Sequence, residues 1–224
     1  IKDYVAFYAQ TGKYKEAESD FTKTIGSEAK AIVLMDALAY RYSYAGNITA
    51  SAYLFKKLIS MNPEAEKAAK YQYQIVQDYL NVNNLKAFKE EMGEWVEKYG
   101  PKSYWAEKNA SKPDLVKETF SLQETTVRNH TLRLHQTAIS VKTDYSRQIA
   151  GDAYKMYLHY FADSPKSSEM HFFYAELLFD MKEYEKAAQQ YQWVAENDKK
   201  SPYYEKSVIN NVLALEKLLP TDAK

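Results

Sequence analysis

The side chains best suited to acid–base or metal chemistry in this sequence are four histidines. They are His130, His135, His159 and His171. Two metal ligands on one helix usually lie three or four residues apart, on the same face, whereas His130 and His135 are five apart, and no HExxH motif occurs. Arg128 and Arg133 stand beside them and would repel a cation. We therefore expect ordinary surface or interface histidines, with no metal site.

The remaining reactive groups give no stronger pattern. No two glycines lie within six positions of each other, so the sequence has no glycine-rich phosphate loop. Paired carboxylates such as Glu90 and Glu91 fall on polar positions, where we expect them to be solvated. The sequence thus predicts a protein that is not an enzyme and needs no cofactor.

Charge and composition narrow the class of partner. The 224 residues include 30 basic and 30 acidic ones, for a net charge of zero. A nucleic-acid binder usually shows a basic excess, because its affinity comes largely from neutralising phosphates. We therefore expect no nucleic-acid partner.

The sequence contains no candidate membrane span, since no apolar run approaches the roughly 18 residues that one requires. Cysteine is absent, which leaves the redox compartment open. The chain opens at Ile1, so any signal peptide or lipid anchor would lie upstream.

A recurring pattern relates the two ends of the chain. The segment Lys13-Tyr14-Lys15-Glu16-Ala17 returns as Glu183-Tyr184-Glu185-Lys186-Ala187, with the tyrosines 170 residues, or five times 34, apart. A fixed period of this size indicates an array of helix pairs, each packing on its neighbours.

The best-formed unit begins near residue 31. Small Ala39 and large Tyr42 share one face of an expected helix over residues 31–45, Gly46-Asn47-Ile48 makes the turn, and a second helix follows. Asn62-Pro63 reads as the N-cap and first-turn proline of the next helix. This pattern resembles the tetratricopeptide repeat family. The resemblance implies an all-α fold, a right-handed superhelix of about five to six helix pairs with a C-terminal capping helix.

The repeat divides the chain into three expected regions. Residues 1–100 form an N-terminal stack of about three repeats, and residues 148–224 form a C-terminal stack. Residues 101–147 are either a degenerate repeat or a connector of one or two longer helices over residues 115–142. Ser164-Pro165 is expected to end a unit, and Ser201-Pro202 is expected to start a helix, as Asn62-Pro63 is. The capping helix is expected over residues 203–219, with Val208, Val212, Leu215 and Leu219 at helical spacing.

In the resembled family, one stripe of each first helix lines a concave groove that binds a protein or peptide. We call the corresponding residues here the N-terminal stripe and the C-terminal stripe. The N-terminal stripe is Asp36, Tyr40, Tyr44, Lys70, Tyr73, Gln77 and Asn81, and the C-terminal stripe is Phe172, Glu176 and Phe179. Aromatic rings interleaved with amides and acids are typical of protein-recognition surfaces. Tyr42, Tyr157 and Tyr191, in contrast, hold positions that pack helix against helix.

A narrower resemblance covers about the last 90 residues. Tyr157-Leu158-His159-Tyr160-Phe161, Phe173-Tyr174-Ala175-Glu176 and Tyr184-Glu185-Lys186-Ala187 are similar to repeats of bacterial cell-envelope proteins. These include outer-membrane assembly lipoproteins, the Tol-Pal coordinator and deltaproteobacterial gliding-motility lipoproteins. The implied role is a non-catalytic scaffold for protein–protein interaction, in the periplasm or at the outer membrane. A cytoplasmic adaptor and the repeat arm of a larger enzyme remain alternatives.

Overall fold

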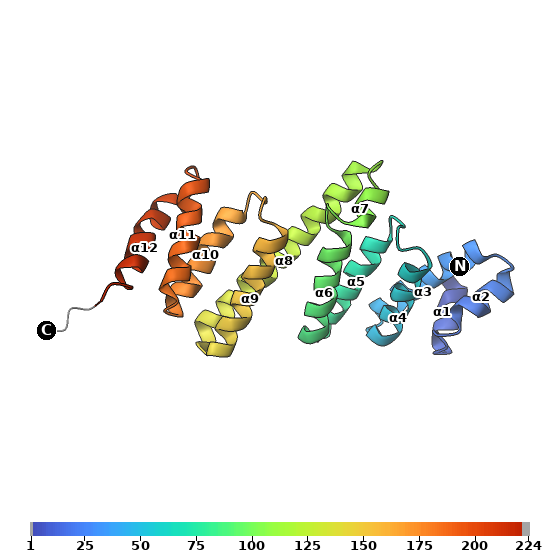
Figure 1. Ribbon diagram of the computed structural model, residues 1–224. Helices are drawn as coiled ribbons and strands as arrows, with labels where there is room; N and C mark the ends of the chain where they lie inside the picture. Colours follow the sequence, from blue (N-terminus) through green and yellow to red (C-terminus); the bar gives the residue numbers. More distant parts are fainter. Residues whose placement is uncertain (1, 221–224) are drawn as a thin grey trace. The chain divides into compact units, whose positions relative to one another are not determined.

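The computed structural model describes residues 2–220, and the regular secondary structure in that part of the chain is entirely helical (Figure 1). The all-α prediction is confirmed. The helices are α1 (Lys2–Gln10), α2 (Ala17–Ile25), α3 (Glu28–Tyr44), α4 (Ile48–Met61), α5 (Ala68–Asn81), α6 (Leu85–Tyr99), α7 (Tyr104–Lys108), α8 (Pro113–Val141), α9 (Asp144–Tyr160), α10 (Ser167–Asp180), α11 (Tyr184–Asn197) and α12 (Tyr204–Glu216). Helices adjacent in sequence pack together in pairs.

A residue in the left-handed conformation marks the turn inside five of these pairs. The residues are Gly12, Gly46, Asn83, Lys142 and Lys182, with φ of 69°, 74°, 55°, 57° and 61°. This conformation reverses the chain after a helix and lets the next amide bond back to the last turn. The amides of Asn47, Asn84 and Glu183 each donate to a carbonyl five residues earlier at 2.9 Å.

The spacing of these turns corrects the expected uniform period. Successive marker residues are 34, 37, 59 and 40 positions apart. The 170-residue separation of Tyr14 and Tyr184 therefore spans unequal units and does not reflect five equal repeats. The recurrence did locate genuine turns, because both tyrosines follow a marker residue by two positions.

Residues 124–224 contain an internal repeat of 37 residues. Ala150, Tyr154 and Tyr157 of α9 are buried, and so are Ala187, Tyr191 and Val194 of α11, each 37 positions later. The turns that follow also match, since the Phe161 and Asp198 amides donate to the Tyr157 and Val194 carbonyls at 2.8 and 3.0 Å. Small residues at these positions let neighbouring helices approach closely, and the large ones fill the space between them.

Asn62-Pro63 and Ser201-Pro202 do not start helices, which contradicts the sequence prediction, whereas Ser164-Pro165 follows the end of α9 as expected. Asn62 is the C-cap of α4, and α5 begins at Ala68. The Ser164 and Ser201 hydroxyls accept hydrogen bonds from the amides two residues on, at 3.1 and 3.2 Å, which forms a separate turn. Helices α10 and α12 begin only after that turn. The serines thus satisfy a backbone donor locally, as turn residues do.

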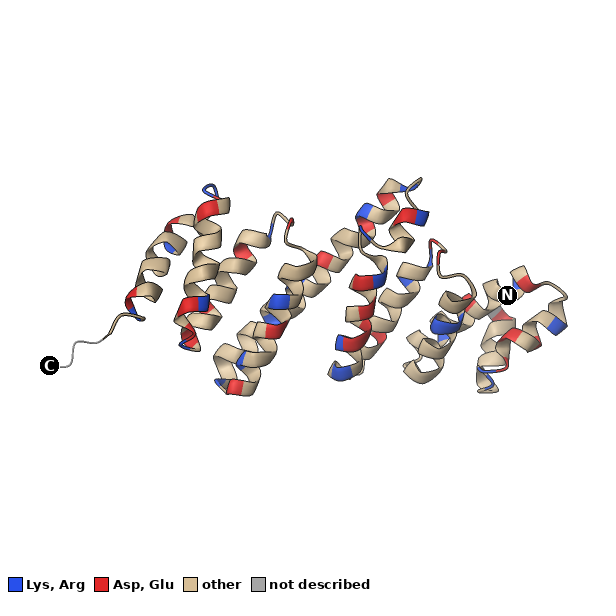
Figure 2. Cartoon of the chain, viewed as in Figure 1, with Lys and Arg blue, Asp and Glu red and all other residues tan. Residues whose placement is uncertain are grey.

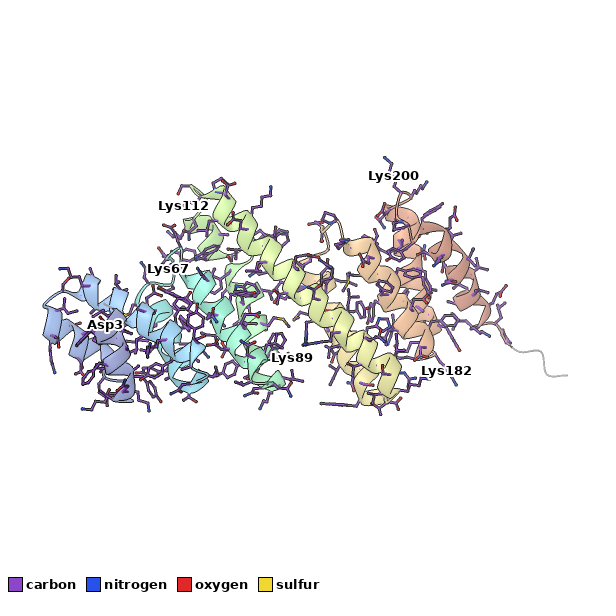
Figure 3. All side chains as sticks on the ribbon, turned by 180° about the vertical axis from the view of Figure 1, so that it is seen from behind. Asp3, Lys67, Lys89, Lys112, Lys182 and Lys200 are labelled. Carbon is purple, nitrogen blue, oxygen red and sulfur yellow. The ribbon has the colours of Figure 1, made fainter. Side chains whose placement is uncertain are left out.

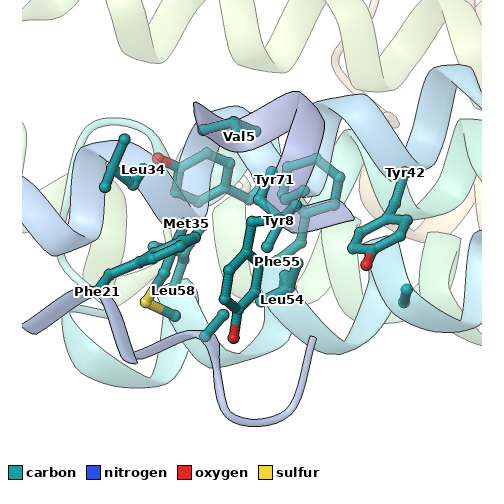
Figure 4. Packing of buried hydrophobic residues seen from close by; sticks show 14 of the residues in the cluster. Val5, Tyr8, Phe21, Leu34, Met35, Tyr42, Leu54, Phe55, Leu58 and Tyr71 are labelled. Atoms are coloured by element: carbon teal, nitrogen blue, oxygen red, sulfur yellow. The ribbon is translucent and has the colours of Figure 1, made fainter. Parts of the chain in front are cut away.

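The first compact unit, Ile1–Gln123, has a core rich in aromatic side chains (Figure 4). The rings of Tyr8 and Phe21 lie 4.6 Å apart between α1 and α2. The Tyr42 hydroxyl donates to the Ala9 carbonyl at 3.0 Å and so joins α3 to α1. Phe55 of α4 is fully buried. Packing tyrosines of the kind expected from the sequence therefore tie successive pairs together.

The middle of the chain is occupied by one long helix. Helix α8 has 29 residues, Pro113–Val141, and follows the five-residue helix α7. The structure thus matches the longer-helix alternative, and Leu115 and Leu122 lie on this helix instead of on a separate pair. The second compact unit, Glu124–Lys224, begins within α8.

The length and apolar character of the helices decide whether one of them could cross a membrane. Across residues 2–220, no helix combines the length and the apolar character that a membrane crossing requires. Lysine, arginine, aspartate and glutamate are interspersed along the helices (Figure 2).

Candidate partner-binding faces

The part of the N-terminal stripe on α3 runs from half-buried Asp36 and Tyr40 to exposed Tyr44. Tyr44 is 82% exposed, and its ring stacks on that of half-buried Tyr40 at 6.2 Å. Tyr40 in turn packs edge-on against Phe55, with ring centroids 5.0 Å apart, and this contact holds the Tyr40 ring in place. Lys67, at the N-terminus of α5 (Figure 3), donates to the Asp36 carboxylate at 2.7 Å.

The electrostatics of this face follow from burial beside a carboxylate. The pKa of Tyr40 is raised to about 12. Burial is the largest cause, and the nearby Asp36 and Tyr44 raise the pKa further. Burial and the Asp36 carboxylate also raise the pKa of Tyr71. Both phenols therefore stay protonated at neutral pH and keep their hydrogen-bond donors. Because Asp36 is already paired with Lys67, the exposed ring of Tyr44 is the part of this face that a partner can reach.

The part of the N-terminal stripe on α5 borders a hollow. Lys70 and Tyr73 line a cavity of about 250 Å³. The other lining residues are Glu66, Ala69, Trp95, Leu115, Glu118, Thr119 and Leu122. The Tyr73 ring lies 4.8 Å from that of Trp95. Trp95 is 1% exposed, and its indole Nε1 has no hydrogen-bond partner. The floor is thus apolar, with charged residues around it.

The remaining predicted residues of α5 lie along the same helix. Gln77 is half-buried and Asn81 is exposed, at the end of α5. The four α5 positions recur at intervals that keep them on one face of a helix. In the N-terminal stripe, three residues are exposed and four are half-buried. The exposed ones are Tyr44, Lys70 and Asn81, and the half-buried ones are Asp36, Tyr40, Tyr73 and Gln77.

In the C-terminal stripe Phe172 is buried, whereas Glu176 and Phe179 are half-buried. Phe172 is 5% exposed, and its ring stacks on that of Tyr203 at 4.8 Å. Glu176 accepts hydrogen bonds from the Tyr191 hydroxyl and, at 3.0 Å, from Asn210 Nδ2. Phe179 packs against Tyr184 at 5.1 Å. These residues hold α10 against α11 and α12, so their contacts are already used within the unit.

A buried carboxylate network under the N-terminal stripe escaped the sequence reasoning. Asp78 is 1% exposed and accepts hydrogen bonds from the Ser43 and Ser51 hydroxyls, each at 2.7 Å. Gln74 Nε2 donates to the same carboxylate at 3.0 Å. The network joins α3, α4 and α5. Its members are up to 35 residues apart in sequence, so no local motif reveals it.

The expectation that Glu91 is solvated is wrong. Glu91 is 8% exposed, and its carboxylate binds Lys56 Nζ and, at 2.8 Å, Gln72 Nε2. Burial of a carboxylate is tolerated when several donors satisfy it. Glu91 thereby links α6 to α4 and α5.

Two histidines serve packing in the second unit. The Nδ1 atom of His135 lies 2.6 Å from the Tyr154 hydroxyl, and that of His171 lies 2.7 Å from Gln190 Oε1. Burial lowers the pKa of both imidazoles. His159 is exposed. Among residues 3–220, no three histidine, aspartate or glutamate side chains gather as a metal-ligand set.

Comparison with known proteins adds no assignment. Neither a protein-family model nor a curated protein sequence matches this chain.

Proposed function

We propose that the protein is a non-catalytic scaffold of the tetratricopeptide type that binds a helix or peptide of a partner protein on its N-terminal stripe. The observation that carries the proposal is the set of tyrosines on α3 and α5, in which Tyr44 is 82% exposed and Tyr40 and Tyr73 are half-buried. Tyr73 lines the apolar hollow, and exposed Tyr44 lies on the neighbouring helix α3. Aromatic anchors and pockets of this kind concentrate binding energy in protein interfaces.

The repeated turns support a solenoid architecture. In a solenoid each pair contacts only its neighbours, and the array offers an extended binding surface. The left-handed turn residues and the adjacent pairing of helices fit this scheme. The right-handed superhelix is part of the proposal.

The cellular setting is proposed from the resemblance of the C-terminal segment to bacterial envelope repeats. On this basis the protein organises an envelope complex, in the periplasm or at the outer membrane, and a role in motility is one form of it. A signal peptide with a lipidation site upstream of Ile1 in the gene would support this setting. A cytoplasmic adaptor would lack one.

Occupation of the hollow can be tested without removing a packing residue. Thr119→Trp places a bulky ring among the lining residues, whereas Ser121→Trp adds the same ring to an exposed position of α8 outside the lining. We expect Thr119→Trp, and not Ser121→Trp, to weaken partner capture by about tenfold, or about 1.4 kcal/mol. Tyr40→Ala, Tyr44→Ala and Tyr73→Ala together should abolish capture. Unchanged capture with an intact helical circular-dichroism spectrum would reject the N-terminal stripe.

A further inference from the structure

A cavity of about 300 Å³ in the second compact unit lies outside both stripes. We call it the α9 cavity, because residues of α9 form one side of it. Its buried floor is Gly151, Tyr174 and Leu178, and polar and charged side chains of α9 and of the start of α11 surround this floor. The rim of the cavity is therefore suited to a polar ligand.

One buried hydroxyl in this cavity has no partner. Tyr174 is 6% exposed, and its hydroxyl makes no hydrogen bond with any residue of the described range 2–220. The hydroxyls of the other buried tyrosines of the unit are all bonded: Tyr154 to His135, Tyr157 to Glu124 and Tyr191 to Glu176. Burial raises the pKa of Tyr174, and the Glu183 carboxylate raises it further. Because Glu183 also lines the α9 cavity, the unpaired hydroxyl lies on the side of the ring that faces the cavity. Buried polar groups are normally paired, so this hydroxyl points to a ligand.

Gly151 leaves additional space in the floor. A Cβ built there would lie 3.8 Å from Tyr174 Cε2, which is an ordinary contact, so packing does not require glycine. The equivalent residue one repeat later is Ala188, which is buried in α11. Glycine inside a helix is less favourable than alanine. The chain thus gives up helix stability here and gains room in the α9 cavity.

The charged groups of the rim are already paired. Each carboxylate has a cationic partner three residues away: Asp144 with Arg147, Asp152 with Lys155 and Glu183 with Lys186. The carboxylates of the cavity are therefore not free for an ionic ligand. Each pair still has unused hydrogen-bonding capacity, because a carboxylate has about four acceptor sites and an ammonium has three donors. Gln148 and the Tyr174 hydroxyl add groups that both donate and accept.

A sugar ring matches this set of groups. Each sugar hydroxyl donates and accepts, and one ring carries several of them in a small volume, whereas a peptide backbone has one donor and one acceptor per residue. A cavity of about 300 Å³ is at the small end of ligand sites. We propose that the α9 cavity binds a sugar ring, with the Tyr174 hydroxyl bonded to one sugar hydroxyl and the ion pairs of the rim bonded to others.

Binding can be measured on the full chain labelled with ¹⁵N-glycine, because Gly151 is the only glycine among residues 124–224. Methyl glycosides of glucose, galactose and N-acetylglucosamine are titrated while the glycine amide signals are recorded by NMR. Inorganic phosphate, methylguanidinium and N-acetylglycine methylamide are titrated in the same way and represent an anion, a cation and a peptide. The signal that Gly151→Ala removes is that of Gly151.

Two further variants separate binding from folding. Tyr174→Phe removes the unpaired hydroxyl and breaks no hydrogen bond within the protein, so the melting temperature should not change. Tyr160→Phe is the matched control, since Tyr160 lies on α9 outside the lining of the cavity. Binding to Gly151→Ala is followed from the ligand signals by saturation transfer.

We expect at least one glycoside to shift the Gly151 signal saturably and to leave the five glycine signals of the first unit unchanged. Tyr174→Phe should weaken this binding about tenfold, the effect of one lost hydrogen bond, and Tyr160→Phe should not. Gly151→Ala should weaken binding by a similar factor and raise the melting temperature.

The proposal would be overturned if no glycoside shifted the Gly151 signal, or if Tyr174→Phe bound as tightly as the unchanged protein. A stronger effect of phosphate, methylguanidinium or the peptide amide would also overturn it, in favour of that class of ligand. A disaccharide that binds tighter than its monosaccharide would support the proposal with a glycan as the ligand, and equal binding would support it with a free sugar.

Discussion

The residues of the two stripes correspond in sequence position but differ in chemical type. Taking Gly46 and Lys182 as equivalent turn residues, 136 positions apart, Asp36 and Lys67 correspond to Phe172 and Tyr203. The first two form an ion pair, and the second two form a stacked aromatic pair.

The next position along the stripe differs in the same way. Tyr40 corresponds to Glu176, and Phe55 corresponds to Tyr191. Tyr40 rests edge-on against Phe55, whereas Glu176 is hydrogen-bonded by Tyr191. Corresponding positions thus make different contacts because their residue types differ, and only the N-terminal ones are part of the proposed binding face.

The largest expected effect is on stability. Phe172→Ala should lower the free energy of unfolding by about 3–5 kcal/mol, because it empties a buried site between Tyr191 and Tyr203. Asp36→Ala at the equivalent position should cost about 1 kcal/mol or less, since its partner Lys67 is exposed. Chemical denaturation followed by circular dichroism measures both. Similar losses would contradict the distinction between open and closed stripes.

The buried carboxylate beneath the open stripe should have the next effect. Asp78→Ala leaves the Ser43, Ser51 and Gln74 donors without their shared acceptor, and we expect a loss of about 2–3 kcal/mol. Its equivalent in the second unit is Ala214, so no such network supports α12. Asp78→Asn retains one acceptor oxygen and should lose less. If Asp78→Ala were neutral in denaturation experiments, the network would not support the face.

Replacing the ion pair of the first unit by the aromatic pair of the second tests whether these residue types govern binding. Asp36→Phe combined with Lys67→Tyr recreates the aromatic pair of the second unit on α3 and α5. We expect stability to change by only about 1 kcal/mol and partner capture to fall about tenfold. Capture at the original level would show that the chemistry of these two positions does not govern binding.

A smaller effect of pH should be confined to the second unit, which holds all four histidines. Burial lowers the pKa of His135 and His171 below the ordinary value of 6.5. The unfolded chain therefore binds protons more readily, and their stabilising contribution, complete above pH 6.5, is lost as the pH falls below it.

Hydrogen exchange at pH 7.5 and 5.5 measures this loss segment by segment. After correction for the intrinsic slowing of exchange at low pH, we expect lower protection in α9–α11 at pH 5.5, corresponding to on the order of 1 kcal/mol. His135→Gln with His171→Gln should remove the pH dependence. Equal acceleration in α3–α6 would contradict the assignment.

The sequence alone predicted the features that depend on short spacing. Alternating small and large residues located the buried positions of Tyr42 and Tyr191, and Gly46 located a left-handed turn. The sequence did not reveal that Phe172 is covered, because its cover, Tyr203, comes from 31 residues later. The equivalent Lys67 has the same separation from Asp36 and leaves the face open.

The side of α12 that packs was missed for a related reason. The capping helix was expected from the helical spacing of its apolar residues, but Val208, Val212 and Leu215 are exposed, and the small residues Ser207 and Ala214 are buried instead. Hydrophobic periodicity identifies a face that tends to be covered, but it does not identify the element that covers it.

Site-specific photo-crosslinking tests the central claim most directly. A benzophenone amino acid replaces Tyr44, 82% exposed on the open stripe, or Tyr145, 74% exposed on α9, in the protein expressed in its own cells. We predict a discrete crosslinked partner from position 44 that is absent from position 145 and is lost with Thr119→Trp. The same products from both positions, or none from position 44, would contradict the claim that α3 and α5 form the binding face.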